Sequence, residues 1–156
     1  LMGVGSPEDL VQGVSLGIDL YDCALPTRLA RNGALFTRQG RVNINNARFR
    51  EQSSPIAGGC DCYTCGSYSA AYLHHLFKAQ ELLAYRLATI HNLRFIMRLM
   101  QEIREAILQG GFQTYKKRFL AEYKVTDQDV RVAQKAKWIA KRGQGALSGE
   151  RHEEDD

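Results

Sequence analysis

Three cysteines, Cys60, Cys62 and Cys65, stand within six residues of one another in the stretch GGCDCYTC. Thiolates at this spacing can converge on one metal ion, and the two glycines before them permit the tight turn that this requires. Three close thiols are an odd number for a disulfide framework but supply most of a tetrahedral zinc site. Such a site would tie this loop to whichever segment supplies the fourth ligand, so it constrains the fold strongly. The alternative is a trio of redox-active or simply buried cysteines.

The sequence does not identify the fourth ligand of this predicted metal site. Cys23 is far away in the sequence and belongs to another motif, and His152 lies in the C-terminal tail. The remaining candidates are His74, His75 and His91. A lone histidine is usually a hydrogen-bonded structural residue, which we expect of at least two of these three. Spacing alone does not choose among them.

The composition is that of one soluble globular domain, with 156 residues, 44% of them hydrophobic and 24% charged. No apolar run approaches the length that spans a bilayer, so we expect no membrane association. The first residues, LMGVGSPEDL, have no basic leader and resemble a cut inside a larger fold rather than a signal peptide. Four cysteines without secretory context favour a reducing compartment, and we expect a cytoplasmic protein.

The charge is mildly basic, at +4 with an isoelectric point near 8.9. The C-terminal stretch GERHEEDD concentrates acidic residues, so the middle of the chain is more basic than the average. A surplus of this size suits a polyanionic partner, but an ordinary solvated surface explains it equally well.

The first 22 residues are predicted to form a β-α-β unit. Residues 1–5 and 18–22 are short apolar runs that predict two parallel strands. Between them, Ser6 has the character of a helix N-cap and Pro7 occupies the first helical position. A single unit of this kind needs neighbouring strands to cover it.

No later segment resembles a third core strand. Residues 34–49 alternate around Gln39-Gly40 and predict an exposed hairpin instead. The β-α-β unit is therefore left without a partner, which again indicates part of a larger fold.

The second half of the chain is predicted to be helical. Residues 69–88 predict one or two helices, and an apolar stripe with a period of 3.6 follows over residues 96–107, closed by Gly110-Gly111. A further short helix is expected over residues 112–123. After Thr126 the periodicity is lost, and we expect the last dozen residues to be disordered.

A second group of candidate residues lies in IDLYDCALPTRLARNG. Asp22 ends a predicted strand, where α/β folds place catalytic groups, so its carboxylate is a candidate nucleophile or base; the alternative is a helix cap or turn residue. Arg28 and Arg31 follow on a predicted loop that begins at Pro26. Two guanidiniums there suit a phosphate-bearing substrate, or they are an ordinary solvated pair.

Together these stretches resemble one family, the tRNA-guanine transglycosylases, also called queuine tRNA-ribosyltransferases. The sequences LMGVGSPEDLVQGVSLGIDLYDCALPTRLARNGALFT, NINNARF, CDCYTC, AYLHHL and TIHNL occur in the order and at the spacing of that family. The resemblance covers about residues 1–123, and the stretch PTRLARNG is similar to bacterial members.

The resemblance implies an α/β fold, namely the C-terminal part of a TIM (β/α)8 barrel with a zinc-binding subdomain and C-terminal helices. Residues 1–57 would hold the last barrel strands with the catalytic and tRNA-binding loop. Residues 58–126 would form the zinc-binding subdomain and the C-terminal helices, and residues 127–156 a charged, partly disordered tail.

The resemblance also implies roles for single residues. One structural Zn²⁺ per chain would be bound by Cys60, Cys62, Cys65 and His91, which leaves His74 and His75 as helix residues. The carboxylate of Asp22 would attack C1′ of the ribose and expel guanine, giving a covalent intermediate that the incoming base resolves. The tRNA-binding residues would be Arg28 and Arg31, and the base pocket would include Met2 and Gly3.

The implied reaction exchanges guanine at the anticodon wobble position of tRNA for 7-aminomethyl-7-deazaguanine in queuosine biosynthesis. The implied partners are tRNA with a G-U-N anticodon, the 7-deazaguanine base and a second copy in a homodimer formed through the zinc region. Two departures stand out. The family commonly has arginine in place of Ala70, and its acid-base aspartate lies in earlier barrel strands, so we expect the isolated chain to be inactive. The alternative function is a non-catalytic, zinc-stabilised RNA-binding module.

Overall fold

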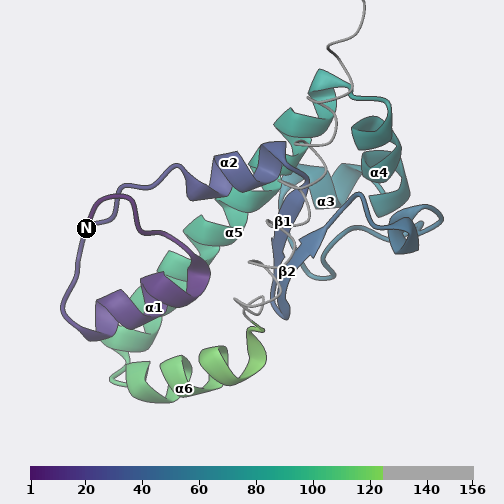
Figure 1. Ribbon diagram of the computed structural model, residues 1–156. Helices are drawn as coiled ribbons and strands as arrows, with labels where there is room; N and C mark the ends of the chain where they lie inside the picture. The colour runs from purple at the N-terminus through teal and green to yellow at the C-terminus, as the bar shows by residue number, and fades with distance from the viewer. Residues whose placement is uncertain (125–156) are drawn as a thin grey trace, which may run out of the picture. The chain divides into compact units, whose positions relative to one another are not determined.

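Helix α5 (Leu82–Leu108) runs through the middle of the molecule, and the other helices and a β-hairpin lie along it (Figure 1). The computed structural model describes residues 1–124. The tail predicted at residues 127–156, with the disorder expected at its end, lies outside the described residues.

The remaining elements follow one another along the chain with short connections. In order they are α1 (Pro7–Ser15), α2 (Leu25–Arg31), β1 (Ala34–Thr37), β2 (Gly40–Asn43), the 3-10 turn η1 (Ala47–Phe49), α3 (Tyr63–Ser67), α4 (Ala70–Lys78), α5 and α6 (Phe112–Glu122). Figure 1 shows α1 and α6 near one end of α5, and α3, α4 and the hairpin toward the other. The described part of the chain is thus a mixed α and β structure.

The N-terminal β-α-β prediction is confirmed in its order but not in the length of its strands. Helix α1 begins after Ser6, whose hydroxyl accepts a hydrogen bond from the Asp9 amide at 3.3 Å. The two flanking runs meet only in one parallel bridge, between Met2 and Asp22. Two strands without neighbours have little to hold them in a longer ladder, so the pairing stays at a single bridge.

The loop predicted around the two arginines is wrong, because residues 25–31 form helix α2. Pro26 lies in the first turn, where a missing amide proton costs nothing and its fixed φ favours the helix. Gly33, with φ of +74°, follows the end of the helix, and its amide donates to the Ala30 carbonyl at 2.9 Å. The same residues that predict a loop thus begin and end a short helix.

The predicted hairpin is confirmed, but its predicted exposure is wrong, because residues 35–37 of β1 are buried against α5 and the hairpin core. Strands β1 and β2 pair antiparallel, with Thr37 opposite Gly40 at the turn. The turn is held from outside as well, since the Lys124 amide donates to the Gln39 carbonyl at 3.1 Å. Gly40 forms an isolated bridge with Lys124, and a Cβ at this glycine would collide with the Lys124 backbone.

The predicted helical half is confirmed, with two helices where one or two were expected. Gln80, at φ of +58°, lies between α4 and α5 and breaks the helical conformation there. The apolar stripe at residues 96–107 belongs to the same α5, which ends before Gly110 at φ of +69°. Helix α6 agrees with the helix expected over residues 112–123.

Two hydrophobic clusters lie along α5. The first, called here the hairpin core, joins α2, the hairpin, α4 and the N-terminal half of α5 and consists of Ala30, Leu35, Ile44, Phe49, Ala70, Leu73, Leu76, Phe77, Ala84, Leu87 and Ala88. The second, the helical core, joins α1, α6 and the C-terminal half of α5 and consists of Leu10, Val11, Leu99, Ile103, Tyr115, Phe119 and Tyr123. One helix therefore supplies both clusters.

Several large apolar side chains near the N-terminus remain exposed. Met2, Leu16 and Leu20 are 79%, 83% and 80% exposed, respectively. Among residues 1–124, none of the helices is both long enough and apolar enough to cross a membrane.

Candidate metal centre

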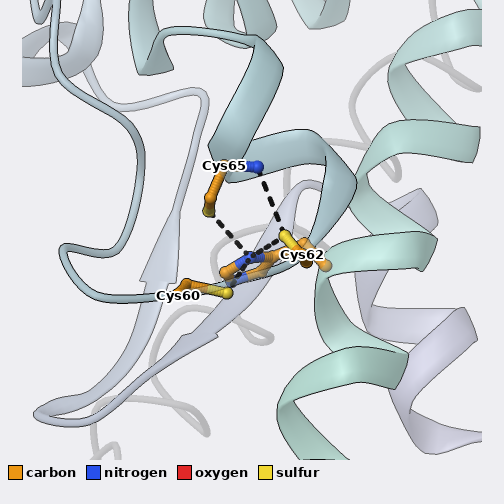
Figure 2. Close-up of side chains that lie close together, drawn as sticks. Cys60, Cys62 and Cys65 are labelled. Carbon is orange, nitrogen blue, oxygen red and sulfur yellow. Dashed lines mark hydrogen bonds between the residues drawn. The ribbon is translucent and has the colours of Figure 1, made fainter.

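Four side chains from three segments converge beside the hairpin. Cys60 lies on the loop after Gly58-Gly59, Cys62 is the residue that caps α3, and Cys65 lies within that helix (Figure 2). The fourth group is His91, from the middle of α5. Its Nδ1 atom lies 3.8, 3.5 and 3.3 Å from the sulfur atoms of Cys60, Cys62 and Cys65. All four candidate ligand atoms lie within 4.8 Å of one another.

These distances fit a tetrahedral metal site. A zinc ion with bonds of about 2.3 Å to sulfur and about 2.0 Å to nitrogen separates a sulfur and a nitrogen ligand by about 3.5 Å. The observed separations of 3.3 to 3.8 Å bracket that value. Three thiols and one imidazole are also a ligand set that zinc favours. The residues present therefore fit a metal ion of this kind.

Of the three candidate histidines, the structure brings only His91 to the thiols. Its Nε2–H donates to the Phe36 carbonyl of β1 at 2.8 Å, which leaves the Nδ1 lone pair facing the sulfur atoms. His74 is buried and donates from Nδ1 to the Ile44 carbonyl at 2.7 Å instead. His75 is exposed on α4.

The thiols share their protons unequally before a metal binds. A hydrogen bond from Cys65 is the largest influence on Cys62 and lowers the pKa of its thiol to about 3. The same interaction raises the pKa of Cys65. Burial disfavours a charged His91, but hydrogen bonds with the Cys60 and Cys62 sulfurs outweigh it and raise the pKa of the imidazole to about 9. A metal ion would displace these protons.

Two arginines that sequence reasoning did not single out fasten the cysteine loop to α5. Arg94 makes a two-pronged ion pair with Asp61, with Nε and Oδ1 at 2.9 Å. Its hydrogen bonds are the main cause that lowers the pKa of Asp61 to about 2. Arg98 donates to the Gly59 carbonyl at 3.0 Å. Their spacing of four residues on one helix face is the only signal that the sequence gives.

The candidate catalytic segment supplies no ligand to the metal cluster. The backbone of Asp22 is joined to the N-terminus by two hydrogen bonds, from the Gly3 amide to the Asp22 carbonyl at 2.8 Å and from the Asp22 amide to the Leu1 carbonyl at 3.1 Å. The structure therefore places Met2 and Gly3 beside Asp22, and all three are exposed.

Arg28 and Arg31 lie one turn apart on α2, and both are exposed. Side chains three apart on a helix project from the same side, so the two guanidiniums can contact one extended ligand. Helix α2 begins three residues after Asp22, which keeps the carboxylate and the arginines on one short segment.

Known proteins of one family are similar to most of this chain. A sequence model of the family described as "Queuine tRNA-ribosyltransferase" matches residues 1–125. A protein of that name from Dehalococcoides mccartyi is 58% identical over 142 residues, which cover 91% of this chain and 36% of the relative. One from Dictyoglomus turgidum is 54% identical over 138 residues, covering 88% and 36%, respectively. The chain thus spans about a third of the length of the curated relatives that it matches.

Proposed function

The chain belongs to the queuine tRNA-ribosyltransferase family, and on that premise we propose that it is part of a tRNA-guanine transglycosylase. The enzyme would exchange guanine at the anticodon wobble position for 7-aminomethyl-7-deazaguanine in queuosine biosynthesis. The observation that supports this proposal is the backbone pairing of Asp22 with Met2 and Gly3, which brings the proposed nucleophile close in space to the residues proposed for the base pocket.

In this proposal residues 1–57 are the last part of a TIM barrel, and residues 58–126 are the zinc-binding subdomain with the C-terminal helices. The parallel bridge between Met2 and Asp22 supports this, because parallel pairing is the arrangement of barrel strands. The exposed apolar side chains of Leu16 and Leu20 are also what strands and helices of a larger barrel would cover.

Asp22 is the proposed nucleophile. Its carboxylate oxygen attacks C1′ of the ribose as the bond from C1′ to guanine breaks, giving a covalent tRNA adduct. The departing base needs a proton, which by resemblance comes from an aspartate in the earlier barrel strands. The incoming deazaguanine then attacks C1′, loses its own proton and releases the carboxylate, so the exchange needs no ATP. The anionic carboxylate also stabilises the oxocarbenium character of the reacting carbon.

The proposed tRNA contacts come from the two exposed arginines of α2, Arg28 and Arg31, which would bind the anticodon around the exchanged base. Met2 and Gly3 would form the floor of the base pocket. Because the reacting nucleotide lies in a loop, its base can be turned out and read on its edges. A G-U-N anticodon is the substrate that this proposal specifies.

The metal is proposed to be one structural Zn²⁺ held by Cys60, Cys62, Cys65 and His91. Four protein ligands leave no open position, so the ion would stabilise the fold and take no part in the exchange. A homodimer formed through the zinc region and a cytoplasmic location complete the proposal. Without the rest of the protein we expect no turnover.

The test is trapping of the tRNA adduct by the complete protein. Asp22→Asn should bind tRNA but form no denaturant-resistant adduct and incorporate no labelled guanine, because an amide is a poor nucleophile. Asp19→Asn, at another exposed aspartate in the same segment, is the control and should react like the wild type. Adduct formation by Asp22→Asn at the wild-type level would exclude Asp22 as the nucleophile. A wild-type protein that binds RNA but never exchanges a base would favour the non-catalytic RNA-binding module.

A further inference from the structure

We propose that Asn92 is a positioning residue that holds the start of α2, and with it the substrate-binding segment, on the helix that carries His91. This rests on the proposed function in one respect, namely that the segment from Asp22 to Arg31 binds and attacks tRNA. The observation itself concerns a buried side chain that neither the metal centre nor the proposed reaction uses.

Asn92 is fully buried and uses both ends of its amide. Its Nδ2 group donates to the Pro26 carbonyl and to the Ala34 carbonyl, each at 3.0 Å. Its Oδ1 accepts a hydrogen bond from the Phe36 amide, also at 3.0 Å. An asparagine amide has two donor hydrogens and one carbonyl oxygen, so both donors and the oxygen are engaged.

The contact with Pro26 fixes where α2 begins. The Pro26 carbonyl lies in the first turn of α2, four residues after Asp22 and two before Arg28. The chain between is short, and the Leu25 amide is further held by the Cys23 sulfur at 3.4 Å. A shift of the start of α2 therefore moves the carboxylate and the first arginine together.

The contact with β1 joins this anchor to the metal centre. Phe36 donates its amide to Asn92 and accepts at its carbonyl from His91 Nε2 at 2.8 Å. Two successive residues of α5 thus hold both polar backbone groups of one strand residue. Because Nδ1 of the same His91 faces the thiols, the metal cluster, β1 and the start of α2 form one connected set of hydrogen bonds.

The side chain at this position has to be an amide to satisfy all three groups. An aspartate has nearly the same shape and can still accept from Phe36, but it has no hydrogen for the Pro26 and Ala34 carbonyls when ionised. A buried carbonyl that loses its donor is destabilising, and the element that carries it then shifts toward water. The predicted consequence is a misplaced α2 on an otherwise intact protein.

The experiment compares variants of the complete, zinc-loaded protein. Asn92→Asp removes the two donations, and Asn92→Ser is a milder second variant that leaves room for a bridging water. The matched control is Thr37→Val, which keeps the shape of the side chain and removes another buried donation to a backbone carbonyl, that of Gly40 at the hairpin turn. The measurements are zinc content, amide hydrogen exchange of residues 28–31 and the rate of tRNA adduct formation at saturating tRNA.

Both Asn92 variants should keep one zinc per chain. Asn92→Asp should exchange the amides of α2 at least about 10-fold faster and form the adduct about 100-fold more slowly, and Asn92→Ser should change both rates in the same direction but by less. The control variant should change neither the amide exchange of α2 nor the rate of adduct formation, although its thermal stability should fall about as much as that of the Asn92 variants. Unchanged amide exchange in α2, or an equal change of both rates in Thr37→Val, would overturn the proposal. If the wild type itself forms no adduct, the proposed function fails, and hydrogen exchange alone then decides whether Asn92 holds α2.

Discussion

The two parts of the chain that carry the proposed chemistry are built in opposite ways. The metal region, residues 57–67 with the part of α5 that faces them, buries three of its four candidate ligands and joins its loop to α5 through Arg94 and Arg98. The N-terminal unit, residues 1–24, has one parallel bridge and leaves large apolar side chains in the open. All four candidate ligands of the metal region come from this chain, whereas the N-terminal unit leaves apolar surface uncovered.

The largest effect is expected from the metal region. His91→Ala removes a ligand and the donor to the Phe36 carbonyl, so zinc should be lost and the free energy of unfolding should fall by on the order of 5 kcal/mol. Metal analysis and thermal unfolding measure both quantities. His75→Ala, at an exposed histidine of α4, should retain zinc and stability. Full zinc content in His91→Ala would assign the fourth ligand elsewhere.

The next effect sharpens the contrast between a covered and an uncovered leucine. Leu87 is 1% exposed in the hairpin core, so Leu87→Ala should lower the free energy of unfolding of the protein by about 2–5 kcal/mol. Leu20→Ala, at a side chain 80% exposed, should cost less than about 0.5 kcal/mol in this chain. In the complete protein the Leu20 cost should rise to about 2 kcal/mol or more, because neighbouring strands would cover it. Denaturant unfolding measures these losses of stability. If Leu20→Ala costs equally little in this chain and in the complete protein, the N-terminal unit is not covered in either.

A smaller effect concerns tRNA affinity. Arg28→Ala should weaken tRNA binding by about 1–3 kcal/mol if its guanidinium contacts a base edge, with zinc content unchanged. A contact with phosphate alone would give a smaller loss and reduce the salt dependence of binding. Titrations at several salt concentrations separate the two cases. Arg86→Ala, at an exposed position of α5, is the control, and an equal loss there would indicate only general charge attraction.

The smallest effect is expected where α5 meets the hairpin turn. Burial would raise the pKa of Glu102, but hydrogen bonds from Arg38 and Tyr115 outweigh it and hold the pKa below its ordinary value of 4.5. A lowered folded-state pKa contributes stability above about pH 4.5 that is lost as the pH falls through the folded-state pKa.

Glu102→Gln should therefore cost about 0.5–1 kcal/mol at neutral pH, since the Arg38 partner is partly exposed, and the difference from the wild type should vanish in acid. Unfolding curves across this pH range measure it. Glu105→Gln, at an exposed position of the same helix, is the control and should leave the stability at neutral pH unchanged.

The sequence predicted local structure well where one signal dominated, as with the Ser6 cap, the hairpin turn and the glycine stop of α5. It failed at α2, because Ala24 provides no side-chain cap and seven residues around a proline carry little periodicity. The helix is stabilised by tertiary contacts with α5, which no local pattern reveals.

The candidate site divides in the same way. The thiols were evident because they are close in sequence, but the histidine that joins them lies 26 residues beyond Cys65 and is selected by the packing of α5 on β1. Asn92 lies in the stretch TIHNL that contributes to the family resemblance, but its role was not predicted, because it depends on three backbone partners that only the structure shows.

Because α5 contributes to both cores, it also fixes the angle around its axis between the side chains that face one core and those that face the other. Each residue of an α-helix advances by about 100° around the axis. An insertion of one residue between His91 and Leu99 would therefore turn Leu99 and Ile103 away from α1 and α6 while the metal ligand stayed in place. An insertion of four residues, close to a whole turn, would restore most of the alignment but displace the two ends by about 6 Å along the axis. Insertions and deletions between His91 and Leu99 should therefore disrupt the fold. The loop before Cys60 can change in length as long as Cys60 still reaches the metal cluster.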